Sequence, residues 1–266
     1  MGILNVTPDS FSDGGQHNKP TEAIKRAIEM VQQGANIIDI GGESTRPGAK
    51  DVSMQEQLDR VIPVIQGIRK SSAKQVTISI DTTDYQVAKK ALEVGANWIN
   101  DISAGEDSEN MIALAARQNC PIILMHRQGK SDRMQNNPTY DDVCKEVKEY
   151  LQERSQIALD SGVGKENIIL DPGIGFGKML QHNLALLSDL ESLVALGFPV
   201  LLGASRKRFL GEILDENDPM QRIVGTCATT ALGVQAGVQI FRVHDVIENK
   251  QSMDVAWAIK GNNNEY

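Results

Sequence analysis

One arrangement of apolar and polar positions recurs along the chain. An amphipathic stretch ends at a glycine, a short apolar run follows the glycine, and the run ends in polar residues. Clear copies of this arrangement have their glycine at Gly34, Gly95, Gly197 and Gly237. Glycine reaches the left-handed backbone conformation that ends a helix, and the apolar run after it is typical of a strand buried on both faces. The pattern therefore predicts helices that alternate with buried strands.

Short apolar runs predict eight strands with helical segments between them. The predicted strands are Gly2–Asn5, Ile37–Ile40, Val76–Ile80, Trp98–Asp101, Ile122–Met125, Ile168–Asp171, Val200–Gly203 and Gln239–Val243. Strands joined through helices pair in parallel, and eight such units in 266 residues are typical of a (β/α)8 TIM barrel. An open doubly wound sheet is the alternative. No linker rich in Gly, Ser or Pro divides the chain, so we expect one α/β domain over residues 1–266.

The helices on the amino-terminal side of the four glycines are predicted at Ala23–Gln33, Tyr85–Val94, Leu184–Leu196 and Ile223–Ala236. Pro63 lies inside another stretch with helical spacing. Because proline lacks the N–H that a helix interior uses, we expect Pro63 to kink that helix or to mark its exposed start.

Composition narrows the class of protein. There are 35 acidic and 27 basic residues, a net charge of −8, which argues against nucleic acid or an anionic membrane as the main partner. No apolar run is long enough to span a membrane, and no leader of the secretory type opens the chain. The cysteines Cys120, Cys144 and Cys227 form no CxxC motif, which favours a reducing cytoplasm and excludes a cysteine zinc site.

Nearly every predicted strand is followed by polar or charged side chains. In chain order they are Asn5, Asp39 with Glu43, Asp81, Asn100 with Asp101, His126, Asp171, Ser205 with Lys207, and Arg242 with His244. Any one of them can simply mark the end of a buried strand. The carboxyl ends of barrel strands converge on one mouth, however, so the set as a whole predicts an active site there.

These side chains divide into two groups. The basic group is Lys207, Arg242, His244 and Arg46, and the segment Ser205–Lys207 opens a helix whose N–H groups can face an anion. The acidic and amide group is Asp81, Asn100, Asp101 and Asp171. Buried carboxylates require hydrogen-bond donors, so we expect a ligand with an anionic tail and a flat head that carries amino and ring N–H groups.

Two of the predicted loops after strands are unusual, Asn5–Gly15 and Gly41–Gly48. Both combine glycine and proline with charged residues. Long loops at this face of a barrel are more often lids or ligand clamps than plain surface loops.

Eight segments at the strand ends carry distinctive motifs. They are N-V-T-P-D-S-F-S-D-G-G at Asn5–Gly15, G-G-E-S-T-R-P-G at Gly41–Gly48, S-I-D-T at Ser79–Thr82, I-N-D at Ile99–Asp101, L-M-H at Leu124–His126, L-D-P-G-I-G-F-G-K at Leu170–Lys178, G-A-S-R-K-R-F at Gly203–Phe209 and R-V-H-D at Arg242–Asp245. Together these segments resemble the dihydropteroate synthase family. They cover all eight strand ends in order, so the resemblance spans nearly the whole chain.

The resemblance implies a pterin-binding TIM barrel that acts in folate biosynthesis. Enzymes of this family, which sulfonamides target, join 6-hydroxymethyl-7,8-dihydropterin pyrophosphate to p-aminobenzoate, giving 7,8-dihydropteroate and pyrophosphate. The resemblance further implies Mg²⁺ as cofactor, a cytoplasmic location and a homodimer formed through the last helices.

The resemblance also assigns roles to residues. The pterin would be held by Asp81, Asn100, Asp171, Phe176, Lys207 and Arg242, with Arg242 over the ring face. Pyrophosphate would be held by Asn5, Arg242 and His244, and Mg²⁺ by Asn5. The loops for p-aminobenzoate would carry Phe11, Thr45, Arg46 and Arg208, and the catalytic residues would be Asp13, Lys207 and Arg46. Arg208 stands where many family members have serine.

Two alternatives remain open at this point. A pterin-binding methyltransferase domain would share the pterin carboxylates, and a non-catalytic pterin-binding protein would share the pocket. Neither requires the basic group for pyrophosphate. Asp9, Glu43, Asp101 and His126 each have a plain structural explanation as well.

Overall fold

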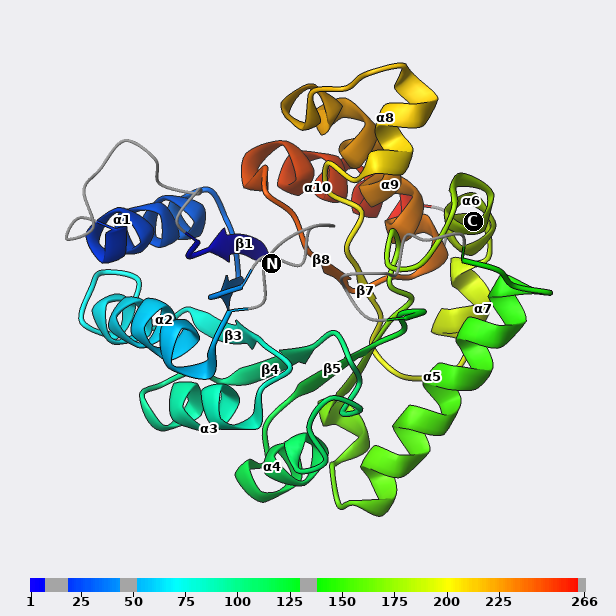
Figure 1. Ribbon diagram of the computed structural model, residues 1–266. Coiled ribbons are helices and arrows are strands. Elements are labelled where there is room, and N and C mark those ends of the chain that lie inside the picture. Colours follow the sequence, from blue (N-terminus) through cyan, green and yellow to red (C-terminus); the bar gives the residue numbers. More distant parts are fainter. Residues whose placement is uncertain (8–18, 44–51, 130–137, 263–266) are drawn as a thin grey trace.

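The structure is a computed structural model that describes residues 1–7, 19–43, 52–129 and 138–262. Strands and helices alternate along the chain, with the strands at the centre (Figure 1). The strands are β1 (Gly2–Asn5), β2 (Ile37–Gly41), β3 (Thr77–Asp81), β4 (Trp98–Asp101), β5 (Ile122–Met125), β6 (Ile168–Asp171), β7 (Leu201–Leu202) and β8 (Ile240–Phe241). Every predicted strand is therefore confirmed, with its ends in place or shifted by at most two residues.

The strands close into a barrel. Strands β1 to β6 pair in parallel in chain order, and β7 pairs in parallel with β8. Two isolated bridges join these sheets, Leu170 with Val200 and Gly2 with Val243. The last strand thus returns to the first, which confirms the (β/α)8 barrel and excludes an open doubly wound sheet.

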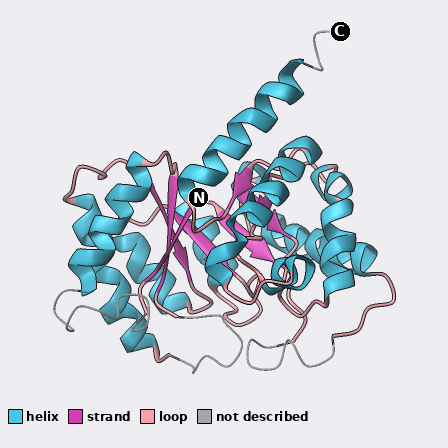
Figure 2. Cartoon of the chain, turned by 90° about the horizontal axis from the view of Figure 1, so that it is seen from above, coloured by secondary structure: helices cyan, strands magenta, loops and turns pink. Residues whose placement is uncertain are grey.

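Helices surround the strands in both views (Figures 1 and 2). They are α1 (Lys19–Gln32), α2 (Met54–Arg69), α3 (Tyr85–Glu93), α4 (Met111–Gln118), α5 (Val143–Asp160), α6 (Leu180–Ser188), α7 (Leu190–Val194), α8 (Arg208–Leu214), α9 (Ile223–Ala236) and α10 (Val246–Asn262), with short 3-10 turns η2 (Lys165–Asn167) and η3 (Pro219–Arg222). Gly34, Gly95, Gly197 and Gly237 all have positive φ, as the pattern predicted. No helix among the described residues is long and apolar enough to cross a membrane.

One predicted helix is wrong, and one of the two alternatives for Pro63 is excluded. The single helix expected at Leu184–Leu196 is divided into α6 and α7 at Asp189. The Ser192 hydroxyl donates to the Asp189 carbonyl (3.0 Å) and to its carboxylate (2.5 Å), and such local bonds compete with a continuous helix. Pro63 lies inside α2 rather than at its start. It is on the exposed face of α2, where water can replace the missing backbone bond.

The strands separate two layers of apolar side chains. Ile123, Ile169 and Leu201 form a small cluster of their own, whereas their chain neighbours Ile122, Ile168 and Leu202 belong to the large cluster between strands and helices. Successive side chains of a strand point to opposite faces. The small cluster is therefore the barrel interior, and the same alternation decides which strand-end side chains face inward.

Candidate active site

Polar side chains continue the inward-facing series at the carboxyl ends of the strands. Because they alternate with outer-layer residues, Asp39, Asp81, Asn100, Asp171 and Arg242 all point into the barrel. We call these five the strand-end cluster. Asp39, Asn100 and Asp171 are buried, with 0%, 3% and 6% of their surface exposed. The fold thus brings together residues that are far apart in the sequence.

Arg242 is held between two carboxylates. Its Nε donates to Asp39 Oδ2 at 2.7 Å and its Nη2 donates to Asp81 Oδ2 at 2.6 Å. The same Asp39 oxygen accepts from Asn100 Nδ2 at 3.0 Å. Asp39 therefore orients both Arg242 and Asn100, although it was not among the predicted pterin residues. Its position at a strand end was the available signal.

The strand-end cluster perturbs the protonation of its members. Burial raises the pKa of Asp81 to about 7, and Arg242 opposes this shift. Burial also raises the pKa of Asp171, opposed chiefly by Lys207. Burial would lower the pKa of Arg242, but Asp39 and Asp81 outweigh it and raise that pKa. Perturbed groups in a strand-end mouth are typical of a ligand site, because buried carboxylates gain from a ligand that donates hydrogen bonds.

The loop between β6 and α6 places a cation and an aromatic ring beside Asp171. Asp171 Oδ1 accepts from the backbone N–H of Gly173 at 2.7 Å. Lys207 Nζ donates to the carbonyl of Ile174 and lies 4.5 Å from the centre of the Phe176 ring. Burial lowers the pKa of Lys207 to about 8, while Asp171 opposes that shift. Lys207, Phe176 and Asp171 are therefore close together, as predicted.

Ser205 and His244 lie together at the ends of β7 and β8. The Ser205 hydroxyl accepts from the backbone N–H of His244 at 3.1 Å and lies 2.9 Å from His244 Nδ1. The hydroxyl can donate to Nδ1, and a neutral His244 ring that accepts this bond carries its proton on Nε2. A donor at this position suits an anion.

The two arginines after β7, Arg206 and Arg208, form salt bridges with carboxylates outside the strand-end cluster. Arg206 pairs with Asp245, with Nε 2.9 Å from Oδ2. The Arg208 side chain is 84% exposed and pairs with Glu212 of its own helix at 2.8 Å.

Two residues expected at the mouth, Asp101 and Glu43, form hydrogen bonds with neighbouring protein groups. Asp101 faces the outer layer, where its carboxylate accepts from the backbone N–H groups of Ser103 and Gly105, both at 2.8 Å. The expectation that Asp101 lies in the mouth with Asn100 is wrong, because neighbours on a strand point to opposite faces. Glu43 accepts from the side chain of Gln57 at 3.2 Å.

The remaining assignments fall at the edge of what the structure describes or beyond it. Asn5 ends β1 opposite Gly41 and is half-buried. Asp9, Phe11, Asp13, Thr45 and Arg46 lie outside the described residues. Within residues 1–7, 19–43, 52–129 and 138–262, no group of three or more His, Cys, Asp or Glu side chains is placed to hold a metal.

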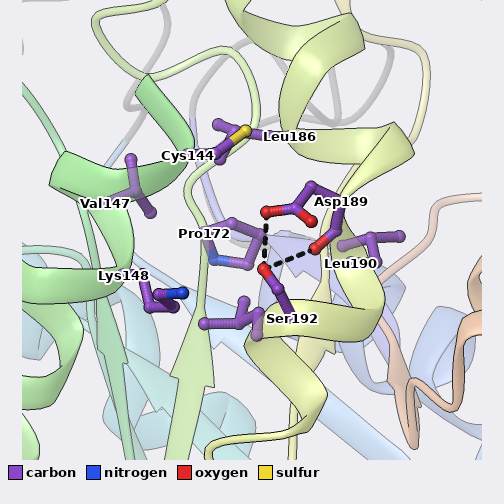
Figure 3. Close-up of a pocket in the computed structure, with 9 residues that line it drawn as sticks. Cys144, Val147, Lys148, Pro172, Leu186, Asp189, Leu190 and Ser192 are labelled. Atoms are coloured by element: carbon purple, nitrogen blue, oxygen red, sulfur yellow. Dashed lines mark hydrogen bonds between the residues drawn. The ribbon is translucent and has the colours of Figure 1, made fainter. Parts of the chain in front are cut away.

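A small hollow between α5 and α7 is separate from the mouth (Figure 3). Its lining residues are Cys144, Val147, Lys148, Pro172, Leu186, Asp189, Leu190, Ser192 and Leu193. It contains no member of the strand-end cluster, and the Asp189 carboxylate is already bonded to Ser192. The ligand site is therefore assigned to the mouth.

Comparison with known proteins agrees with this geometry. Residues 1–244 match the family described as pterin binding enzymes. The dihydropteroate synthase of Synechocystis sp. is 49% identical over 259 residues, covering 97% of this chain and 89% of the relative. That of Bacillus subtilis is 50% identical over 246 residues, covering 92% and 83%.

Solved structures agree as well. The dihydropteroate synthase of Xanthomonas albilineans with 4-aminobenzoic acid superposes with a TM-score of 0.91 at 42% identity, covering 98% of this chain and 92% of that one. The Yersinia pestis dihydropteroate synthase with a sulfonamide drug complex also gives a TM-score of 0.91 at 42% identity, covering 98% and 94%. This chain therefore belongs to the dihydropteroate synthases, within the family of pterin-binding enzymes.

Proposed function

We propose that this chain condenses 6-hydroxymethyl-7,8-dihydropterin pyrophosphate with p-aminobenzoate to give 7,8-dihydropteroate and pyrophosphate. The observation that carries the proposal is the strand-end cluster itself. The acceptors of Asp81, Asn100 and Asp171, of which the last two are buried, share one mouth with the cations Lys207 and Arg242. This set matches a ligand whose head donates hydrogen bonds and whose tail is anionic.

The pterin head is assigned to Asp171. A carboxylate with one oxygen engaged by Gly173 still has its other oxygen for the exocyclic amine and the adjacent ring N–H. Asn100 and Asp81 are proposed to meet the neighbouring ring edges, and Lys207 the ring carbonyl. Phe176 would wall the pocket, with the planar Arg242 guanidinium over the ring face.

The pyrophosphate tail is assigned to His244, Arg242 and Asn5. His244 would donate through Nε2, in the orientation that its bond to Ser205 favours. Arg242 would contribute its charge from between Asp39 and Asp81. The departing group develops negative charge, so fixed donors and cations at this end lower the barrier more than they strengthen ground-state binding.

The chemistry follows from the leaving group. Pyrophosphate departs from a methylene that is attached to an electron-rich dihydropterin, so the C–O bond can break early with positive charge spread into the ring. Asp171 and Asp81 stabilise that charge, Lys207 supports the ring carbonyl side, and the arylamine attacks the methylene carbon. The arylamine step depends more on positioning than on a strong base.

Magnesium is proposed as the cofactor. Mg²⁺ prefers oxygen donors, keeps several waters and is often held by one or two protein groups together with substrate phosphates. The Asn5 side chain at the end of β1 fits such a site. When bound, Mg²⁺ would neutralise charge on the pyrophosphate. Asp13 and Arg46 are proposed to act at this end of the reaction.

The second substrate is proposed to bind between loops. Phe11, Thr45, Arg46 and Arg208 would surround p-aminobenzoate after the pterin ester is bound. The support for this substrate is the similarity to the Xanthomonas albilineans enzyme, which was solved with 4-aminobenzoic acid. A methyltransferase is less favoured, because Lys207, Arg242 and His244 supply the basic group that a pyrophosphate ester requires and a methyltransferase does not.

A homodimer is also proposed, through α9 and α10. These helices expose several large apolar side chains: Val224 (80%), Leu232 (64%), Val255 (61%), Trp257 (45%) and Ile259 (54%). Apolar and small side chains of both helices line one groove, and the end of α10 extends beyond the body of the barrel (Figure 2). An apolar patch of this kind is typical of an interface.

The test of the activity is a turnover assay. The purified chain, supplied with the dihydropterin pyrophosphate ester, p-aminobenzoate and Mg²⁺, should release pyrophosphate and form dihydropteroate in equal amounts. Removing Mg²⁺ with a chelator should stop product formation, and adding it back should restore it. Binding of pterin without any turnover under these conditions would favour the non-catalytic alternative. A cytoplasmic location is proposed from the cysteine pattern and is checked by cell fractionation.

A further inference from the structure

Lys178 is a buried lysine whose amino group is fully engaged with neutral partners. Only 3% of its surface is exposed. Its Nζ lies 2.9 Å from His126 Nδ1, 3.3 Å from the His126 carbonyl and 3.0 Å from the Phe176 carbonyl. Lysine is rarely buried unless it is paired, so a role beyond packing is indicated.

These contacts join two loops of the barrel mouth. His126 follows β5, and Phe176 lies in the loop between β6 and α6. The two loops approach each other closely, because a Cβ on Gly173 would lie 1.9 Å from the His126 carbonyl oxygen and a Cβ on Gly177 would lie 2.4 Å from that of Gln128. Lys178 thus donates to carbonyls on both sides of a tight junction.

The junction supports the side chains assigned to the pterin. The Phe176 ring lies against Lys207 Nζ, and Lys207 donates to the Ile174 carbonyl of the same loop. Asp171 is the last residue of β6, and its Oδ1 accepts from the backbone N–H of Gly173 at the start of this loop. A shift of the loop would therefore move the aromatic wall, the cation and the carboxylate together.

The three partners can all accept from the Lys178 amino group. Burial lowers the pKa of His126 to about 3, with Lys178 adding to that shift, so the ring is neutral. A neutral ring with its proton on Nε2 accepts at Nδ1, and the two carbonyls accept as well. Burial lowers the pKa of Lys178 well below its usual value, while Asp171 opposes that shift.

We propose that Lys178 is a positioning residue of the pterin pocket, which locks the loop carrying Phe176 to the end of β5 and thereby fixes Phe176, Lys207 and Asp171 relative to one another. It acts through these residues rather than by touching the substrate. This inference rests on the proposed pterin site.

The test compares Lys178→Met, which keeps the length of the side chain but removes its donors, with Lys145→Met on the exposed face of α5. Binding of a pyrophosphate-free pterin and of inorganic pyrophosphate is measured separately by calorimetry. Lys178→Met should weaken pterin binding about tenfold or more, because buried carbonyls lose their donor and the loop moves. Pyrophosphate affinity should stay within about twofold of wild type, because a twofold change in affinity corresponds to less free energy than the loss of one hydrogen bond. Lys145→Met should change neither affinity.

A spectroscopic measurement separates positioning from general loss of stability. The ¹⁵N resonance of His126 Nδ1 should move in Lys178→Met and remain in place in Lys145→Met. A moved resonance together with wild-type pterin affinity would overturn the proposal. If Lys178→Met does not fold, Lys178→Gln, which keeps an N–H donor on a shorter side chain, is measured instead. A moved His126 resonance with weakened pterin binding is then expected, and a moved resonance with wild-type pterin affinity would overturn the proposal. Wild-type enzyme that binds no pterin would instead contradict the proposed function.

Discussion

At the residue scale, the mouth of the barrel contains more buried charge than it can pair by itself. Arg242 serves both Asp39 and Asp81, and the buried Asp39 Oδ1 has no hydrogen-bond partner among the residues that the structure describes. Unsatisfied buried polar atoms cost free energy, and functional sites are where proteins retain them. We infer that the cluster is arranged for a ligand rather than for stability.

Asp171→Asn should weaken binding of a pyrophosphate-free pterin by about 2–4 kcal/mol, because a donor replaces an acceptor opposite the ligand N–H groups. Asparagine keeps one oxygen for the Gly173 N–H, so the loop should retain its shape. Calorimetry with pterin measures the loss, and pyrophosphate binding serves as the control. Unchanged pterin affinity would remove Asp171 from this role.

The pH profile of the reaction should fall at alkaline pH, because Lys207 loses its proton there. Burial lowers its pKa to about 8, so the side chain is an ammonium below that pH and loses its charge as the pH rises through it. The kcat/KM for the pterin ester reports groups of the free enzyme and should therefore fall above about pH 8. Lys207→Arg should move this fall to higher pH, because guanidinium stays charged. A profile that is flat across this region in the wild type would argue against a charged Lys207.

At the scale of elements, the loop between β6 and α6 depends on glycine. Gly173, Gly175 and Gly177 all have positive φ, and Gly175 donates its N–H to Asn183 Oδ1 at 2.7 Å. Left-handed backbone is costly for residues with a side chain. The alternation of glycine in this segment is therefore a requirement of the loop shape that carries Phe176.

Gly173→Ala should destabilise the protein by more than about 2 kcal/mol, since left-handed strain adds to a clash with backbone. The added Cβ would lie 1.9 Å from the His126 carbonyl oxygen. Gly261→Ala is the matched control, because nothing lies within 4 Å of a Cβ at that position in α10. It should be neutral or stabilise by up to about 1 kcal/mol. Urea unfolding compares the two, and equal midpoints would show that the loop adapts.

At the scale of the whole molecule, the side of the barrel formed by α9 and α10 exposes large apolar side chains. The groove between α9 and α10 is lined by Ile223, Val224, Cys227, Ala231, Leu232, Gln235, Glu248, Gln251, Ser252, Val255, Ala256 and Ile259. None of these residues belongs to the strand-end cluster. The proposed dimer interface and the proposed ligand site therefore lie on different faces of the molecule.

Leu232→Glu should convert the proposed homodimer to a monomer, because a charge placed in an apolar interface must be desolvated without a partner. Leu232 is 64% exposed in the single chain, so the change should leave folding intact. Leu184→Glu on α6, at a leucine that is 43% exposed, is the control and should not change the mass. Sedimentation velocity measures both. A monomeric wild type at micromolar concentration would contradict the dimer.

Much of this molecule was predictable from the sequence alone. Helix and strand periods, together with glycines at helix ends, determined the element order and the closed barrel. The same reading placed polar residues at the strand ends, and the motifs around them identified the family. These features are local, because side-chain period and backbone preference act over a few neighbouring residues.

Only the tertiary structure decided which of those residues work together. Asn100 faces the mouth and its neighbour Asp101 does not, because the pairing of β4 with its neighbours sets which face is inside. Arg242 reaches Asp39 across 203 positions of sequence, and Lys178 reaches His126 across 52. The closure of the barrel and the approach of its loops bring such partners together. No local pattern of residues encodes a contact between positions so far apart in the sequence.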